Sequence, residues 1–147
     1  PHVSTTRERL AALAALRDAG VPTLVWLSPL LPFINDTEEN VLGIVRACAD
    51  AGVGAILCFG IGMTLRDGNR EYFYAQLGRH FPGLRERYIR TYGNAYMVGS
   101  PNHARLMRVL SNECARLGIR LGGADLFTYL HEFPEKKSAE QLSLFDA

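Results

Sequence analysis

Cysteine is scarce in this sequence, and its spacing excludes the common cysteine-based sites. The three cysteines, Cys48, Cys58 and Cys114, are odd in number and lie far apart along the chain. They therefore form neither a disulfide framework nor a zinc site, and we expect no metal ligands among them. Free thiols are typical of a reducing compartment, so we expect a cytoplasmic protein.

Other absences narrow the class of protein further. No apolar run of about 18 residues is present, which excludes a membrane-spanning helix. Neither sign of charge dominates: the net charge is +1, which neither indicates nor excludes a nucleic-acid partner. The segment Gly60–Leu65 is not a dinucleotide fingerprint, because its sixth residue is Leu, and no phosphate-binding loop is present. We find no Ser, His and Asp grouping that would form a nucleophilic triad.

The length of 147 residues corresponds to one domain or to a large part of one. The chain opens with Pro1-His2-Val3-Ser4 rather than Met, so we expect it to be a piece of a longer gene product. Residues 1–133 carry the apolar patterns of a folded part. Residues 134–147 begin with the polar stretch Pro134–Glu140 and are expected to form a flexible tail.

The order of apolar and amphipathic segments predicts an α/β fold. Nearly continuous apolar runs at residues 22–28 and 54–59 are typical of strands buried on both faces of a parallel sheet, and residues 119–121 form a possible third strand. Amphipathic patterns and capping residues predict the flanking helices. These are expected at residues 6–19, 36–51, 70–80, 84–92, 100–117 and 122–130.

Three residue pairs predict where helices begin. Thr5 and Glu8 have the spacing of a capping box, and so do Asp36 and Glu39. Ser100 and Pro101 are typical of the N-cap and first helical positions. Two or three parallel strands would leave unpaired edges. We therefore expect part of a (β/α) barrel that is prone to self-association at its open edge, the alternative being a small three-layer sandwich completed by dimerisation.

Polar residues follow both predicted strands, where α/β proteins place their binding sites. Glycines Gly60 and Gly62 would allow a ligand to approach the backbone closely. Alternatively, Asp36 only caps a helix and Asn35 only makes a turn. The candidate binding residues are Ser28, Asn35 and Asp36 after the first strand, and Gly60, Gly62, Thr64, Arg66 and Asn69 after the second.

Arginines and tyrosines alternate in residues 66–92. Arginine suits phosphate contacts and tyrosine suits base stacking, so the segment is a candidate nucleic-acid surface. The alternative is a pair of amphipathic helices with solvated arginine faces.

Two segments resemble a known family. The segments Trp26–Pro29 with Pro32–Asn40, and Cys58–Phe73, resemble the later barrel segments of radical S-adenosylmethionine proteins related to spore photoproduct lyase, often labelled DNA repair photolyase-like. The resemblance implies a (β/α) barrel enzyme that uses S-adenosylmethionine and an iron–sulfur cluster. It also implies that the loops at residues 28–36 and 59–69 line the cofactor and substrate site.

The chain departs from that family in one respect. The family holds its cluster with a Cys-x-x-x-Cys-x-x-Cys loop, and this sequence has none. Cleavage of S-adenosylmethionine is the chemistry of the cluster. We therefore expect no cofactor bound to this chain and no catalysis by it alone.

The last residues form a second resemblance. Gln141-Leu142-Ser143-Leu144-Phe145 resembles the pentapeptide by which bacterial DNA-handling proteins attach to the sliding clamp. Leu142, Leu144 and Phe145 would fill an apolar groove, and Gln141 would make a polar contact. Alternatively, the segment packs on its own domain.

The sequence thus supports two hypotheses. Either the chain is the C-terminal half of a radical S-adenosylmethionine enzyme acting on DNA or another nucleic acid, or it is a non-catalytic binding module tethered to the clamp.

Overall fold

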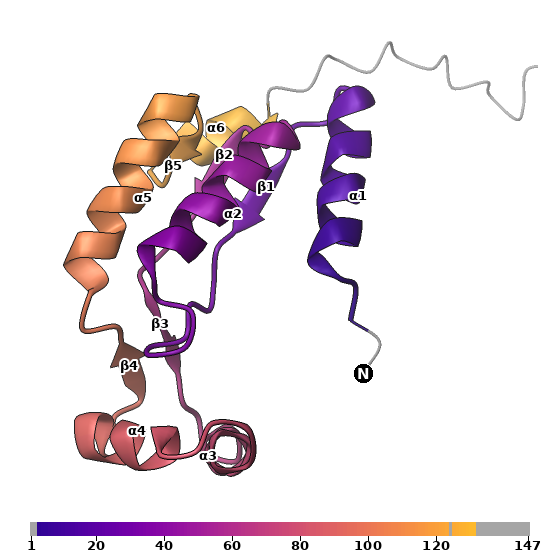
Figure 1. The fold of residues 1–147 in the computed structure, drawn as a ribbon. Helices are drawn as coiled ribbons and strands as arrows, with labels where there is room; N and C mark the ends of the chain where they lie inside the picture. The colour runs from indigo at the N-terminus through magenta and orange to yellow at the C-terminus, as the bar shows by residue number, and fades with distance from the viewer. Residues whose placement is uncertain (1–2, 124, 132–147) are drawn as a thin grey trace, which may run out of the picture.

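The computed structural model describes residues 3–123 and 125–131, and within them it confirms the predicted α/β class (Figure 1). The predicted tail, residues 134–147, with its clamp-binding segment lies outside the described residues. The helices are α1 (Thr6–Asp18), α2 (Glu38–Asp50), α3 (Asn69–His80), α4 (Leu84–Tyr92), α5 (His103–Leu117) and α6 (Asp125–His131). The strands are β1 (Leu24–Trp26), β2 (Ala55–Leu57), β3 (Gly62–Thr64), β4 (Met97–Gly99) and β5 (Arg120–Leu121).

A three-stranded parallel sheet forms the centre of the molecule, in the order β1-β2-β5. Val25 lies opposite Ile56, and Ile56 lies opposite Leu121, so these three side chains share one face. Helices α2 and α5 pack side by side on that face (Figure 1). Among the described residues the sheet does not close into a barrel, and β1 and β5 are its edges.

The hydrophobic core lies between this sheet face and the two helices. Each helix presents apolar residues at helical spacing, as an amphipathic helix packed on a sheet should. Cys48 and Cys114 belong to this core. The fully buried side chains include Val41 and Val45 of α2, Leu106 and Leu110 of α5, and Ile56 of β2.

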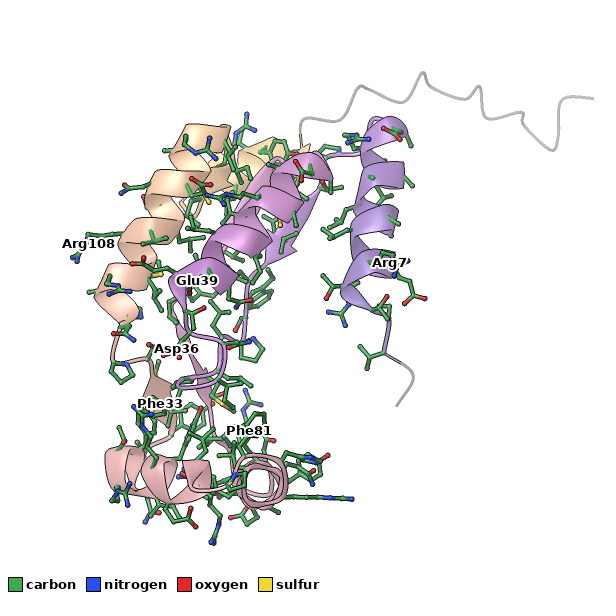
Figure 2. The ribbon with its side chains drawn as sticks, viewed as in Figure 1. Arg7, Phe33, Asp36, Glu39, Phe81 and Arg108 are labelled. Atoms are coloured by element: carbon green, nitrogen blue, oxygen red, sulfur yellow. The ribbon has the colours of Figure 1, made fainter. Side chains whose placement is uncertain are left out.

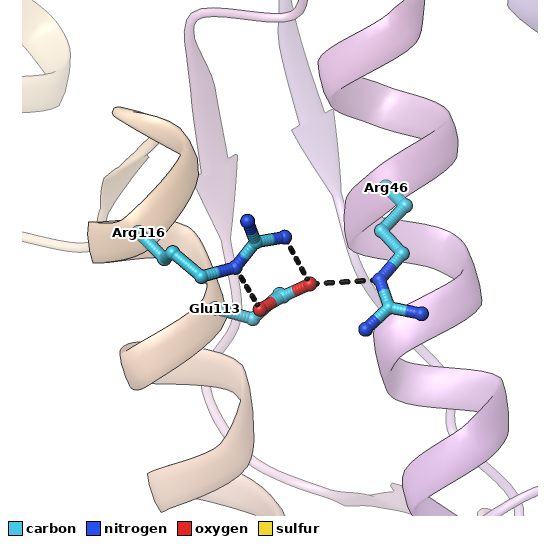
Figure 3. A network of polar contacts seen from close by, with 3 residues as sticks. All are labelled: Arg46, Glu113 and Arg116. Carbon is cyan, nitrogen blue, oxygen red and sulfur yellow. Dashed lines mark hydrogen bonds and ion pairs between the residues drawn. The ribbon is translucent and has the colours of Figure 1, made fainter.

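A polar network joins α2 to α5 at the rim of this core (Figure 3). The Glu113 carboxylate accepts hydrogen bonds from Nε of Arg116 at 2.7 Å and from Nε of Arg46 at 2.8 Å. These hydrogen bonds, that from Arg116 foremost, lower the pKa of Glu113 to about 2. A carboxylate that is only 8% exposed is thus kept ionised by two guanidinium groups.

Strands β3 and β4 form a separate antiparallel ribbon, with Met63 opposite Val98. The ribbon leads away from the parallel sheet and carries α3 and α4 at its far end (Figure 1). The sequence predicted a plain loop at residues 60–68, and this was wrong for Gly62–Thr64. Each ribbon strand has three residues. The two strands are separated in the sequence by helices α3 and α4, so no local pattern predicts their pairing.

An aromatic cluster fixes α3 and α4 against the loop that follows β1. Tyr88 is fully buried, and its hydroxyl donates to the Pro32 carbonyl at 2.6 Å. Its ring packs edge-to-face against Phe33 and Phe73. Phe33 has a φ of 62°, which is rare for a bulky residue, and the Arg87 guanidinium stacks 3.8 Å from the centre of its ring. The surrounding contacts hold this backbone conformation in place.

Two residues of the candidate nucleic-acid surface, residues 66–92, make contacts within the protein. Burial raises the pKa of Tyr88 beyond the ordinary range, which keeps its phenol neutral. Arg70 donates to the carbonyls of Leu65, Gly93, Asn94 and Ala95. Tyr88 is therefore a core residue and Arg70 is bonded to backbone carbonyls. The alternative of solvated arginine faces does not describe Arg70, and the nucleic-acid surface stays a prediction.

Two of the three predicted helix starts are wrong. Thr5 and Glu8 form the expected capping box of α1. Helix α2 is capped by Thr37, whose hydroxyl accepts from the Asn40 amide, and not by Asp36. Helix α5 begins at His103 after Asn102, two residues beyond the predicted cap Ser100. The two residues that were predicted as caps bond to each other instead: the Ser100 hydroxyl donates to the Asp36 carboxylate at 2.5 Å.

Helix α1 packs loosely, with no fully buried residue, and contacts the core through Leu10 and Leu13. Within residues 3–123 and 125–131, no helix combines the length and apolar character needed to cross a membrane.

Candidate functional site

A cavity of about 450 Å³ lies where the carboxyl ends of β1 and β2 meet the β3–β4 ribbon. Two loops and both ribbon strands contribute to its wall, together with the first residues of α3 and α5. Its lining residues are Ser28, Pro29, Phe59, Gly60, Ile61, Gly62, Met63, Thr64, Asn69, Met97, Val98, Gly99 and His103. The lining mixes apolar side chains with a few polar ones, as small-molecule sites do.

Five of the eight binding residues predicted from the sequence line this cavity. They are Ser28, Gly60, Gly62, Thr64 and Asn69. The prediction rested on the rule that α/β proteins bind ligands at strand carboxyl ends. The ribbon brings Thr64 and Asn69 to the same place, although the sequence indicated only a loop there.

The other three predicted residues have structural roles. Asn35 accepts a hydrogen bond from the Leu31 amide at 2.6 Å, which makes the turn that was its alternative role. Asp36 is buried and accepts from Ser100, at the junction between α2 and the ribbon (Figure 2). Arg66 donates to the Tyr96 hydroxyl on the protein surface. None of the three is among the residues that line the cavity.

Packing gives a reason for glycine at the two predicted positions, Gly60 and Gly62, of the cavity wall. A Cβ at Gly62 would lie 2.5 Å from the Val98 carbonyl oxygen, so any side chain there would collide with the ribbon partner. A Cβ at Gly60 would lie 2.9 Å from Cε1 of His103, and the φ of Gly60 is 140°. Packing thus favours glycine at both positions, and the expectation that they let a ligand approach the backbone stays a prediction.

His103 is a cavity residue that the sequence did not indicate. It is the first residue of α5, and its Nδ1 accepts a hydrogen bond from the Ile61 amide at 3.2 Å. Because an amide N–H can only donate, Nδ1 is unprotonated and the neutral ring carries its proton on Nε2. A lone histidine after a Ser-Pro turn matches no motif, so only the fold reveals this position.

Two large aromatic residues stand exposed beside the cavity. Trp26 ends β1 and is 64% exposed, while Phe59 follows β2 and is 78% exposed. Their ring centres lie 5.7 Å apart in an edge-to-face arrangement. Strand alternation places Trp26 on the sheet face opposite Val25, away from α2 and α5.

The residues of this chain do not fit an iron–sulfur cluster. Cys48 and Cys114 are buried in the helical core, while the thiol of Cys58 lies 3.7 Å from the Gly60 carbonyl oxygen. Burial raises the pKa of all three thiols, that of Cys114 to about 11, whereas cluster ligation needs thiolates. In the described part of the chain, no three His, Cys, Asp or Glu side chains gather as metal ligands would.

Comparison with known proteins identifies relatives but no family. No family model matches the chain, and no solved structure matches it. The chain is similar to the uncharacterized proteins Rv2578c of Mycobacterium tuberculosis and Mb2609c of Mycobacterium bovis, at 34% identity over 88 residues. The match covers 60% of this chain but 25% of each relative, so the chain spans about a quarter of the length of these relatives.

Proposed function

We propose that this chain is the C-terminal part of a radical S-adenosylmethionine enzyme related to spore photoproduct lyase, acting in DNA repair or nucleic-acid modification. The observation that carries the proposal is the cavity at the carboxyl ends of β1 and β2, which gathers Ser28, Thr64 and Asn69. Barrel enzymes bind their ligands at this end of the strands. The chain then supplies part of the wall around cofactor and substrate.

The layout of the sheet supports a barrel segment over a three-layer sandwich. The strands follow one another in chain order, and the helices α2 and α5 between them pack together on one face. A doubly wound sandwich would place helices on both faces, whereas a barrel places them all outside. The other face, which carries Trp26, would then be the barrel interior.

The open edges at β1 and β5 need a covering in either arrangement, because unpaired strand edges associate readily. In the proposed parent protein, further barrel strands cover them. In the isolated chain, a second copy is the expected cover, and light scattering that shows a strict monomer at all concentrations would contradict this expectation.

The chemistry of such an enzyme is supplied by its cluster and by S-adenosylmethionine. The cluster has no place on this chain, so it would be held by another part of a longer polypeptide. The polar side chains of Ser28, Thr64, Asn69 and His103 and the apolar side chains of Met63 and Met97 suit a ligand of mixed polarity. Their role is to bind and orient the ligand and to exclude water.

The experiment compares this chain with the protein encoded by its complete reading frame, both reconstituted anaerobically with iron and sulfide. We expect a Cys-x-x-x-Cys-x-x-Cys motif in the complete frame, a bound cluster and release of 5′-deoxyadenosine from S-adenosylmethionine. The isolated chain should show neither the cluster absorption nor the product. A complete protein that lacks the motif and forms no product, or a stoichiometric cluster on this chain alone, would contradict the proposal.

A second candidate function rests on the tail. Gln141–Phe145 has the spelling of a clamp-binding peptide and follows a polar tether, which favours a non-catalytic module held at the DNA sliding clamp. Titration of a bacterial clamp with the chain tests it directly. Absence of binding at micromolar concentrations would leave only the enzymatic proposal.

A further inference from the structure

Ile61 anchors the base of the β3–β4 ribbon beside the cavity. Its carbonyl oxygen accepts a hydrogen bond from the Ser100 amide at 2.9 Å, and its own amide donates to Nδ1 of His103 at 3.2 Å. The residue is only 1% exposed, and its side chain belongs to the hydrophobic core. A buried amide needs a hydrogen-bond acceptor, and for Ile61 the imidazole ring of His103 is that acceptor.

The bond between Ile61 and His103 requires a neutral ring. Nδ1 accepts from an amide only through a free lone pair, and in the imidazolium both ring nitrogens carry protons. Histidine is the side chain that ordinarily gains its charge between about pH 8 and pH 5. Protonation of His103 would therefore leave the Ile61 amide without an acceptor. Because His103 is exposed on the cavity wall, the charged ring has room to turn toward water.

Two other polar contacts near the ribbon keep their bonding over this pH range. The Ser100 hydroxyl donates to the Asp36 carboxylate, and a carboxyl group that gains a proton still has an oxygen that accepts. The Tyr88 hydroxyl donates to the Pro32 carbonyl, and burial raises the pKa of Tyr88, which keeps the phenol protonated. The contact that responds to the proton is thus the one on the cavity wall.

In the described part of the chain, no charged or titratable side chain on the neighbouring elements bonds to the His103 ring. The ribbon strands carry no such side chain. Those on the other elements are Cys58 after β2, Asp36, Glu38 and Glu39 at the start of α2, and Arg105 on α5. Glu38 and Arg105 pair with each other at 2.8 Å, and Glu39 is exposed. Burial raises the pKa of the Cys58 thiol, which keeps it uncharged. A proton on His103 therefore gains no ion pair in place of the lost amide contact.

We propose that His103 is a proton-sensitive switch in the cavity wall. The neutral ring holds the segment Gly60–Gly62 against the start of α5, and the protonated ring releases it. Gly60, Gly62 and His103 all line the cavity, so the release loosens the wall and adds a positive charge to it. The switch depends on bonds within this chain and needs neither a cluster nor S-adenosylmethionine, so its test is separate from that of the proposed function.

The test follows single amides and the imidazole ring of the isolated chain by nuclear magnetic resonance. Amide hydrogen exchange, corrected for the intrinsic effect of pH, measures the protection of Ile61 between about pH 7.5 and pH 5, and the ring nitrogen shifts measure the protonation of His103. The protection of Ile61 should fall about three- to tenfold, as the loss of one hydrogen bond predicts, with the midpoint of the His103 titration. The Leu27 amide, which donates to the Leu57 carbonyl at 2.8 Å, should keep its protection throughout.

Two substitutions separate the switch from the general effect of acid. His103→Asn keeps an oxygen acceptor near the Ile61 amide that does not titrate in this range, so Ile61 should stay protected at both pH values. His80→Asn removes an exposed histidine in the last turn of α3, and it should leave the pH dependence of Ile61 as in the wild type.

The proposal is overturned if the protection of Ile61 in the wild type is the same at both pH values, or if it falls with a midpoint that differs from that of the His103 ring. It is also overturned if His103→Asn keeps the pH dependence, or if His80→Asn removes it. The wild-type measurements decide the question by themselves should His103→Asn fail to fold.

Discussion

The Tyr88 hydroxyl should contribute measurably to folding, because it is the hydrogen-bonding link between α4 and the loop after β1. Tyr88→Phe keeps the buried ring and removes only the donor to the Pro32 carbonyl, which lies 2.6 Å away. Leaving a buried carbonyl without its donor costs about 1–3 kcal/mol. For a chain of this size, each kcal/mol lowers the melting temperature by roughly 2–4 °C.

Tyr72→Phe is the matched control, since Tyr72 lies on α3 and is 66% exposed. Urea unfolding of both variants measures the free energy of unfolding. Native-state hydrogen exchange should show faster opening of residues 30–36 in Tyr88→Phe, because the hydroxyl holds that loop. A change in Tyr88→Phe no larger than that in Tyr72→Phe would refute the reasoning.

The pH dependence gives a second check on the same residue. Burial, and then the nearby charges of Tyr92, Asp36 and Tyr74, raise the pKa of Tyr88 in the folded state. An unfolded tyrosine ionises near pH 10, so above that pH the folded state binds one more proton than the unfolded state. The stability contributed by the neutral phenol is therefore present below about pH 10 and is lost as the pH rises further. Tyr88→Phe should have a shallower alkaline decline in stability.

Three other predictions concern the ion network, the ribbon and the tail. The pKa of Glu113 is lowered to about 2 in the folded state. The stability that its carboxylate contributes is therefore present above the unfolded pKa near 4.5 and is lost as the pH falls toward 2. Glu113→Gln should make the loss of stability in acid less steep, as measured by circular dichroism. Gly62→Ala should destabilise the chain by about 1–3 kcal/mol, because the new methyl group meets the ribbon backbone. Gly43→Ala is the control, since there is open space around that position, and it should be neutral or stabilising by up to about 1 kcal/mol. Urea unfolding measures both. Leu144→Ala/Phe145→Ala should reduce clamp affinity by about 2 kcal/mol or more for each anchor, and equal calorimetric titrations of the variant and the wild type would remove the clamp proposal.

Long periodic segments of the sequence predicted their structure well. The apolar runs around Val25 and Ile56 became neighbouring parallel strands, and residues 84–92 form α4 as predicted. These elements are specified locally, by apolar periodicity and by the glycines that follow them. The position of the cavity followed from the strand order, because parallel strands end together at one edge.

The features that the sequence did not reveal depend on contacts between distant segments. Asp36 has the local pattern of a cap, but it accepts a hydrogen bond from the distant Ser100, and Thr37 caps α2. The ribbon pairs Gly62 with Gly99 across two helices. His103 becomes a cavity residue only because the ribbon places Ile61 against α5. No local pattern of residues carries this information.

The cavity after β1 and β2 is proposed to form part of a reaction site, and one comparison of rates tests this most directly. The test variant is Thr64→Val/Asn69→Ala in the protein from the complete reading frame, which changes two residues that line the cavity. The control is Arg66→Ala, because Arg66 bonds to Tyr96 and does not line the cavity. We expect the cavity variant to form 5′-deoxyadenosine at least tenfold more slowly, which corresponds to about 1.4 kcal/mol, with unchanged cluster content. Arg66→Ala should have the wild-type rate. Equal rates in all three proteins, or an equal loss in both variants, would contradict it.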